Sequence, residues 1–411
     1  MLTYTITKKG TSLSGDITLS PSKSISSRNL VIEAIKNAKF NIDAVTEKDA
    51  DKIIDKLLRK GKVALDEGDP AKAIRFLGAF ILYFGGEWIV TGSKEMKKRP
   101  IADVIDFLNK KGHNIKYLER EGFPPLKIIG KALHGRISRV DASICSQFIS
   151  TSLLISQTLS RDEVIDLKNW IVESPYISQT IRLLNYLGVN SGWNKGEMLI
   201  EYELHDGSEF VVEGDWLSAS YWYQVAALSK KAELRISGLD FESVQGDAII
   251  KEIFEPIGIK STPIDNGVLL KSIKRKIKTF EYDFTNSPDL IPTLVVTCVG
   301  LGIPFRFQGV QSLRLKDVDR IMVLQSQMLK LGAKLKVEKR GDLETIIFDG
   351  KTKFKEHSTI ELNSFSDHRM LMSLAPLSAL GLKIIIDNPR VVSRSYPGYW
   401  EDFKKVGFNV E

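Results

Sequence analysis

Apolar residues along this chain form stretches with helical spacing, and six of these stretches follow a short polar turn that can cap a helix. The candidate caps are Ser24, Asp69, Ser143, Asp215, Ser287 and Ser366. Proline follows two of these caps directly, and proline is tolerated best at the first helical position. Short alternating segments at 87–92, 233–238, 343–350 and 383–388 predict strands between the helices. The pattern therefore predicts a mixed α/β fold.

The capped helices recur at a loose interval of about 75 residues after a shorter first interval, as expected for a repeated unit. A chain of 411 residues exceeds what one hydrophobic core usually serves, so we expect two domains of roughly 200 residues each. Six units in two domains suggest three units per domain. Capped helices occur in any α/β protein, however, so the pattern alone leaves the repeat and a coincidence equally open.

Positive residues gather at or near these caps: Lys23 and Arg28, Lys72 and Arg75, and Arg369. A helix N-terminus already carries unsatisfied N–H groups and a partial positive charge, so added cations are unfavourable there unless an anion is bound. Ser24 and Arg28 are four positions apart and share a helix face, which suits a phosphate or a carboxylate. The charge placement favours binding of a small anion.

Composition narrows the protein class further. With 43% hydrophobic and 27% charged residues the chain is typical of globular proteins, and its net charge of +7 admits nucleic acid, membrane surfaces or small anions as partners. Cys145 and Cys298 lack the spacing of a disulfide framework or a metal site, which suggests a reducing compartment. No signal sequence is evident and the longest apolar stretch, 290–305, is broken by proline and glycine, so we expect a cytoplasmic protein without a membrane span.

Four further segments have competing interpretations. Residues 312–321, SLRLKDVDRI, suit a solvated strand edge or helix start with internal ion pairs. Asp289 follows a proline in a first helical turn, where the helix dipole favours a carboxylate, so a role limited to capping stays open. His368 stands beside an arginine and an aspartate as an anion-site candidate. The lysine run at 271–280 alternates like a strand with a solubilising outer face, although contact with nucleic acid stays open. No P-loop, GxGxxG, HExxH or CxxC motif is present.

Taken in order, these segments resemble the 5-enolpyruvylshikimate-3-phosphate (EPSP) synthase family, the enolpyruvyl transferases of aromatic amino acid synthesis. The similarity runs from about Leu19 to Trp400. The segments that carry it are SKSISSR, AIRFL, SKEMKKRPI, SQF, the PY of ESPYI, EGDWLSASY, PDLIPT, LRLKDVDRI, SDHRM and SRSYPGYW. A single match would be weak, but the ordered set is specific.

The resemblance implies two inside-out α/β domains, each of three βαβαββ-like repeats, with the active site in the cleft between the domains. It implies an inserted domain at 20–230 and a discontinuous domain made of 1–19 and 231–411. The implied reaction transfers the enolpyruvyl group of phosphoenolpyruvate to the 5-hydroxyl of shikimate 3-phosphate and releases phosphate. It implies no cofactor and no metal, a monomer, and no partner among nucleic acids or membranes.

The resemblance also implies the site residues. Catalytic positions by this match are Lys23, Asp289, Lys316, Asp317 and His368. Substrate-binding positions are Ser24, Arg28, Lys72, Arg99, Ser146, Gln147, Ser174, Tyr176, Ser312, Arg320, Arg369 and Arg394. In the family, Asp289 corresponds to the carboxylate proposed as the base toward the 5-hydroxyl, and His368 is a supporting candidate for proton handling or phosphate contact.

Several positions depart from the family pattern. Asp317 replaces the usual glutamate, Cys145 and Ser312 replace a serine and an asparagine, and the match at Ser174 is shifted. The largest departure is EGDPAKA, where the family commonly has GNAGTA. Ala71 stands there for a glycine that permits close backbone approach, so we expect weakened binding of glyphosate, the family's inhibitor.

Three alternatives remain at this point. One is a UDP-N-acetylglucosamine enolpyruvyl transferase, which typically begins its site with a lysine–asparagine pair where this chain has Lys23 and Ser24. Another is a family member that binds anions without turnover. A third is a basic nucleic-acid-binding protein, which would need aromatic residues among exposed cations, whereas Trp216, Tyr221 and Trp222 lie in an apolar helical stretch.

Overall fold

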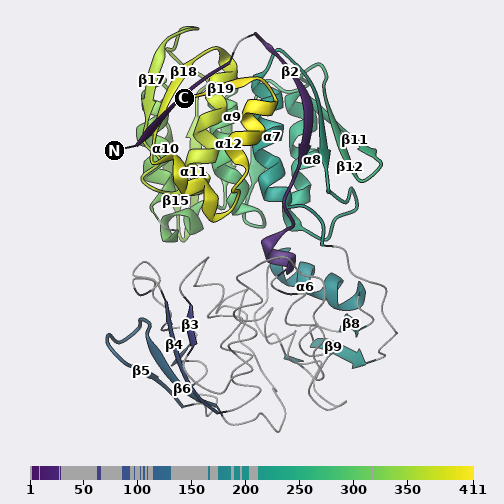
Figure 1. Ribbon diagram of the computed structural model, residues 1–411, viewed down its shortest axis with the longest axis vertical. Helices are drawn as coiled ribbons and strands as arrows, with labels where there is room; N and C mark the ends of the chain where they lie inside the picture. The colour runs from purple at the N-terminus through teal and green to yellow at the C-terminus, as the bar shows by residue number, and fades with distance from the viewer. Residues whose placement is uncertain are drawn as a thin grey trace. The chain divides into compact units, whose positions relative to one another are not determined.

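The fold is taken from a computed structural model of the chain (Figure 1). The structure describes residues 2–8, 10–26, 28, 63–65, 86–92, 97, 102, 105–106, 109, 114–130, 165–166, 175–186, 189–194, 197–202, 212–316 and 318–411. The chain divides into two compact units. Unit 1 comprises Met1–Lys23 and Val212–Glu411, and unit 2 comprises Ser24–Val211. The domain boundaries implied by the family, near Leu19 and Lys230, stay a prediction, and in this division the chain returns to unit 1 at Val212.

Unit 1 consists of three copies of one β-α-β-α-β-β pattern. The first copy is β2 (Ser12–Thr18), α7 (Trp216–Leu228), β10 (Lys231–Ser237), α8 (Ile250–Ile257), β11 (Ile259–Ile264) and β12 (Gly267–Ser272). The second is β13 (Phe280–Asp283), α9 (Ile291–Gly300), β14 (Phe305–Gln308), α10 (Arg320–Leu329), β15 (Lys336–Arg340) and β16 (Leu343–Phe348). The third is β17 (Thr359–Leu362), α11 (His368–Leu374), β18 (Lys383–Asp387), α12 (Tyr399–Lys405), β19 (Phe408–Val410) and, from the start of the chain, β1 (Thr3–Lys8).

Each copy forms a four-stranded sheet with the same order. The sheets are β2-β10-β12-β11, β13-β14-β16-β15 and β17-β18-β1-β19. In every sheet the first pair is parallel and the other two pairs are antiparallel. The predicted threefold βαβαββ repeat is thus confirmed in unit 1. Short 3-10 helices join these elements: η2 (Gly246–Ile249), η3 (Pro288–Leu290), η4 (Gln311–Leu315), η5 (Ala375–Leu380) and η6 (Pro389–Arg394).

The first helix of each copy lies at the centre of unit 1. Helices α7, α9 and α11 pack against one another, and almost every residue of α7 and α9 is buried. A helix that is apolar all round needs such a position, because no face of it suits water. An aspartate precedes each central helix: Asp215 and Asp367 are the N-caps of α7 and α11, and Asp289 lies in η3 directly before α9.

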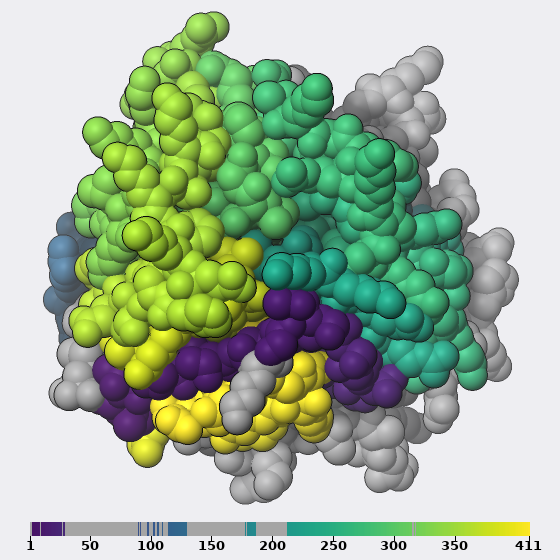
Figure 2. Space-filling model, turned by 90° about the horizontal axis from the view of Figure 1, so that it is seen from above, coloured from purple at the N-terminus to yellow at the C-terminus, as the bar shows by residue number. Residues whose placement is uncertain are grey.

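The start of the chain belongs to two of these sheets. Strand β1 pairs with β18 and β19, and β2 pairs in parallel with β10. In Figure 2 this segment is the purple band that runs beside the yellow C-terminal residues and reaches the teal residues of the first copy. Thr5 and Glu411 exchange two backbone hydrogen bonds of 2.8 and 3.0 Å, so the two ends of the chain lie together.

Described strands of unit 2 repeat the same sheet order in one place. Strands β3 (Val63–Leu65), β4 (Gly86–Gly92), β5 (Asn114–Tyr117) and β6 (Leu126–Gly130) form a sheet of order β3-β4-β6-β5. A second sheet has the order β7-β9-β8, from β7 (Ile165–Asp166), β8 (Val189–Asn194) and β9 (Glu197–Tyr202). Helix α6 (Pro175–Tyr186) precedes β8. Among the described helices of both units, none has the length and apolar composition that crossing a bilayer requires.

Predicted helix starts are correct in part. Asp215 caps α7, since its side chain accepts a hydrogen bond from Leu217 N. The other predictions need correction: Ser287 makes no capping bond, and the cap of α11 is Asp367 and not Ser366. Residues 23–26 and 28 are helical, so this helix begins one position before Ser24. Asp69 and Ser143 lie outside the described residues.

All four predicted strands are present, but the alternating lysine run at 271–280 is not one strand. Only its first two residues belong to β12, and Phe280 begins β13. Between them, Ile273 N and Lys276 N donate to the carbonyls of Gly258 and Pro256, at the end of α8. These bonds to a helix end replace the ladder that a strand would need.

Candidate active site

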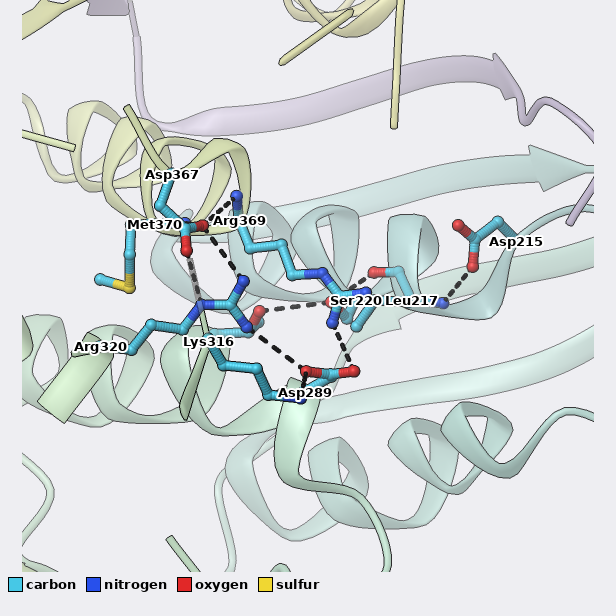
Figure 3. A network of polar contacts seen from close by, with 10 residues as sticks. Asp215, Leu217, Ser220, Asp289, Lys316, Arg320, Asp367, Arg369 and Met370 are labelled. Carbon is cyan, nitrogen blue, oxygen red and sulfur yellow. Dashed lines mark hydrogen bonds and ion pairs between the residues drawn. The ribbon is translucent and has the colours of Figure 1, made fainter. Parts of the chain in front are cut away.

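Asp289 is the centre of a buried ionic cluster in unit 1 (Figure 3). It lies in η3, directly before α9, and its side chain is only 5% exposed. Three cations face its carboxylate: Arg369 Nη1 at 2.5 Å from Oδ2, with Lys316 Nζ at 3.3 Å and Arg320 Nη1 at 3.4 Å from Oδ1. Asp289 is therefore a counter-ion for Arg320 and Arg369, which lie in the first turns of α10 and α11, and it does more than cap a helix.

The protonation state of Asp289 follows from these neighbours. Burial by itself would raise the pKa of the carboxyl group, but the charges of the three cations outweigh burial and hold the pKa well below its ordinary value. Asp289 is ionised at neutral pH for this reason. A carboxylate in this state is a weak proton acceptor until its cations are drawn toward another anion.

Arg320 is held on its other side by Asp367. Its Nε donates to Asp367 Oδ2 at 2.8 Å and its Nη2 to Oδ1 at 3.3 Å. Both side chains are buried, Arg320 at 3% and Asp367 at 0% exposure. Burial opposes ionisation of Asp367, but the charge and hydrogen bonds of Arg320 prevail and lower its pKa.

Asp367 also fixes the start of α11. Its Oδ1 accepts from the backbone N–H of Arg369 at 2.8 Å and of Met370 at 3.1 Å, as an N-cap does. One carboxylate thus orients the guanidinium of Arg320 and anchors the helical turn that carries Arg369. Sequence reasoning named Asp367 only as a neighbour of His368, although an aspartate directly before an apolar helical stretch was the available signal.

His368 follows Asp367 and is largely buried. Burial, reinforced by the positive charge of Arg369, lowers the pKa of its imidazole to about 3. The side chain is therefore neutral at physiological pH. Its Nδ1 makes no hydrogen bond to any residue in the described part of the chain. In this state the imidazole can act as a neutral donor or acceptor toward a bound group, but it adds no charge.

Two more predicted site residues meet at the edge of unit 1. Lys23 Nζ donates to the backbone carbonyl of Arg394 at 3.1 Å. Arg394 is the last residue of η6, its side chain is exposed, and its charge contributes to the lowered pKa of His368. Ser312 lies in η4, and its buried Oγ makes no hydrogen bond within the described ranges.

Unit 2 holds a separate polar group around Arg28. The side chain is 2% exposed, and its Nη1 donates to Ser24 Oγ at 2.6 Å and to Ser24 O at 2.8 Å. The predicted shared helix face of Ser24 and Arg28 is confirmed. Arg28 Nε donates to Thr180 Oγ1 at 2.8 Å, and Ser24 Oγ to Gln179 Oε1 at 3.3 Å. Sequence reasoning missed Thr180 and Gln179, whose signal is polar residues on the buried face of α6.

Of the other predicted site positions, only Tyr176 is among the described residues. Tyr176 lies in the first turn of α6. The remaining predicted site residues lie outside the described residues: Lys72, Arg99, Ser146, Gln147, Ser174 and Asp317. Within the described ranges, no three His, Cys, Asp or Glu side chains come together in a way that could hold a metal ion.

The cluster in unit 1 suits a small molecule with more than one negative charge. Lys316, Arg320 and Arg369 present three positive charges, while the two buried carboxylates supply only two negative ones. Guanidinium groups bind phosphate and carboxylate through paired hydrogen bonds, and low access to water strengthens such contacts.

Comparisons with known proteins agree on one family. The family model described as EPSP synthase (3-phosphoshikimate 1-carboxyvinyltransferase) matches residues 50–403. A protein of Bacteroides fragilis named 3-phosphoshikimate 1-carboxyvinyltransferase is 36% identical over 396 residues, which cover 96% of this chain and 96% of the relative. A protein of the same name from Photobacterium profundum is 28% identical over 423 residues, with 96% of both chains covered.

Solved structures share the fold. An EPSP synthase structure from Acinetobacter baumannii has a TM-score of 0.69 at 16% identity, covering 100% of this chain and 99% of that chain. The enolpyruvyl transferase NikO from Streptomyces tendae has a TM-score of 0.73 at 15% identity, covering 100% and 98%. At these identities the structures show the fold alone, whereas the sequence matches establish kinship. The chain belongs to the EPSP synthase (3-phosphoshikimate 1-carboxyvinyltransferase) family.

Proposed function

We propose that this chain is a 3-phosphoshikimate 1-carboxyvinyltransferase. It transfers the enolpyruvyl group of phosphoenolpyruvate to the 5-hydroxyl of shikimate 3-phosphate and releases phosphate, a step in aromatic amino acid synthesis. The observation that carries the proposal is the buried cluster in which Lys316, Arg320 and Arg369 converge on Asp289, on the segments that match the family. A UDP-N-acetylglucosamine acceptor is not favoured, because the curated relatives reported above carry the shikimate name.

The chemistry requires addition followed by elimination. The 5-hydroxyl oxygen bonds to the enol carbon of phosphoenolpyruvate, its proton leaves to a base, and the methylene carbon gains a proton. The resulting tetrahedral intermediate then loses phosphate and one proton of its new methyl group, which restores the double bond. Both substrates carry a phosphate and a carboxylate, so the site must neutralise four anionic groups.

We assign the roles of the described residues accordingly. Arg320, Arg369 and Arg394 bind the anionic groups of phosphoenolpyruvate, together with Lys23. Asp289 accepts the proton of the 5-hydroxyl, and Lys316 stabilises negative charge beside it. Neutral His368 contacts the phosphate or assists proton transfer. Ser24, Arg28, Tyr176 and Ser312 contact shikimate 3-phosphate.

The proposal extends by family match to residues outside the described ranges. Arg99 and Lys72 join the phosphoenolpyruvate side, and Ser146, Gln147 and Ser174 join the shikimate 3-phosphate side. Asp317 stands where the family has a glutamate linked to proton transfer. Exclusion of water from the bound substrates would strengthen every ionic contact.

The test is release of phosphate from shikimate 3-phosphate and phosphoenolpyruvate by the purified chain. We expect turnover by the native protein, and a loss of at least about 100-fold in Lys23→Ala and Asp289→Ala because each removes a group that acts in the transition state. Lys351→Ala and Asp349→Ala are matched controls from an exposed ion pair and keep full activity. Absence of phosphate release by the native chain, or equal release with UDP-N-acetylglucosamine as acceptor, would refute the proposal.

A further inference from the structure

The two buried carboxylates of the cluster have different surroundings. Asp367 has its oxygens bonded to Nε and Nη2 of Arg320 and to two backbone N–H groups of its own helix start. Backbone donors cannot move away without unwinding the first turn of α11. The two backbone contacts of Asp367 are therefore fixed by the fold, and they hold its carboxylate in place beside Arg320.

Asp289 instead faces side-chain cations. Its carboxylate lies 3.3 Å from Lys316 Nζ, 3.4 Å from Arg320 Nη1 and 2.5 Å from Arg369 Nη1. Lysine and arginine side chains can turn by rotation about single bonds, so these contacts can be exchanged for others. Arg320 contacts both carboxylates: its Nε and Nη2 donate to Asp367, and its Nη1 donates to Asp289 (Figure 3).

An anion that binds these cations must compete with Asp289. Unit charges about 5 Å apart repel by a few kcal/mol even at an effective dielectric of about 20, which is enough to affect binding. The same repulsion acts from Asp367, but Asp367 also holds Arg320 in the orientation that leaves Nη1 available. Removing the two carboxylates therefore has opposite consequences, although both changes delete one negative charge.

We propose that Asp289 and Asp367 act as an exchangeable and a permanent counter-ion of one anion site. In the free protein Asp289 occupies the side of Lys316, Arg320 and Arg369 to which a phosphate or carboxylate group binds. The arriving anion draws these cations away, and Asp289 is then free to accept a proton. Asp367 is a positioning residue, which keeps Arg320 and the start of α11 in place while the exchange occurs.

This proposal rests on the proposed function only in taking phosphoenolpyruvate as the natural anion. The test therefore uses binding and not turnover. Inorganic phosphate and phosphoenolpyruvate are titrated calorimetrically, at low ionic strength and neutral pH, into the native chain and into Asp289→Asn and Asp367→Asn. Both variants keep the shape of the side chain and remove one charge.

We expect Asp289→Asn to bind phosphate about fivefold or more tightly than the native chain, because the competing charge is gone. We expect Asp367→Asn to bind it about tenfold or more weakly, because Arg320 loses its paired contact. Asp319→Asn is the matched control. Asp319 caps helix α10 by accepting from Met322 N and forms an ion pair with Arg314, and neither contact involves the guanidinium of Arg320. We expect the affinity of Asp319→Asn for phosphate to stay within twofold of the native value.

Two outcomes overturn the proposal. Tighter binding in both variants would mean that net charge alone controls affinity, and weaker binding in both would mean general disruption of the site. If Asp367→Asn fails to fold, Arg320→Lys replaces it: this change keeps the charge but loses the paired contact, so it must also bind phosphate about tenfold more weakly. Phosphate affinity that behaves as expected without turnover by the native chain would refute the proposed function and leave this inference standing.

Discussion

The two buried carboxylates of the ionic cluster are stable because each has partners held by secondary structure. An isolated charge moved from water into the interior costs several kcal/mol. Asp367 is supported by Arg320 and by two backbone donors, and Asp289 by three cations. Removing Asp289 or Asp367 would increase the excess of buried positive charge, so these two positions tolerate substitution poorly even where they touch no substrate.

His368 gives a residue-scale prediction about pH. An unfolded histidine takes up a proton below about pH 6.5, whereas folded His368 resists protonation down to about pH 3. The unfolded state therefore binds more protons in this window, and the free energy of unfolding falls as the pH drops through it. The contribution of His368 to the free energy of unfolding is fully present above about pH 6.5 and is lost progressively as the pH falls toward about 3.

Urea unfolding of the native chain and of His368→Gln between pH 6.5 and 4.5 checks this. We expect the native chain to lose about 2 kcal/mol more than the variant over this range. The carboxylates with lowered pKa add their own loss, but mostly below pH 4, so the upper window isolates the histidine. Parallel curves for the two proteins would contradict the neutral, buried state of His368.

At the scale of elements, close approach of two chain segments brings the site residues together. Gly309 follows β14 with φ of +77°, and a Cβ at this position would collide with the backbone nitrogen of Thr285. Thr285 lies four positions before Asp289, and Gly309 lies seven positions before Lys316. A glycine here therefore lets the two segments that carry the ionic pair lie against each other.

Gly309→Ala should lower the free energy of unfolding by about 3 kcal/mol or more, because it adds both backbone strain and overlap. Gly341 is the matched control. It lies in the turn between β15 and β16 with φ of +61°, and nothing lies within 4 Å of an added Cβ. Gly341→Ala should cost only about 1 kcal/mol from strain. Equal losses in chemical unfolding of the two variants would show that the contact with Thr285 does not limit the position.

Sequence patterns predicted the elements better than their ends. Alternation located the strand at 383–388 because its two faces differ in burial, and Asp215 was found because its side chain caps α7. The same rule failed for 271–280, where bonds to the end of α8 are a tertiary contact that local pattern does not encode. Charge placement at a predicted cap indicated Arg369, and the family match gave site roles to Lys316 and Arg320, but their arrangement around Asp289 depends on which helix starts meet in space. Only the fold shows this.

At the scale of the whole molecule, the third repeat is completed by the first strand. Phe408 of β19 lies across from Lys8 of β1 and is 4% exposed. Its ring is 4.6 Å from that of Phe403, and Lys8 Nζ lies 4.4 Å from its centroid. The contacts of this one ring link the start of the chain to its last helix and strand.

Phe408→Ala should destabilise the protein by about 3–5 kcal/mol, as loss of a buried aromatic ring usually does. Asn409 is exposed on the other face of the same strand, and Asn409→Ala should change stability by less than about 0.5 kcal/mol. Thermal unfolding of both variants is the measurement. A small effect of Phe408→Ala would mean that β19 is not needed to complete the sheet.

The pairing of β1 with β18 also determines when the molecule can finish folding. Thr3 lies opposite Asp387, about 380 positions further along, and pairs so distant in sequence form slowly. A chain growing on the ribosome exposes Ile6 and its neighbours as a strand without a partner until the segment that holds β18 has been synthesised. Strand β1 is thus made long before the strand that it pairs with, and during that interval chaperones or other nascent chains can reach it.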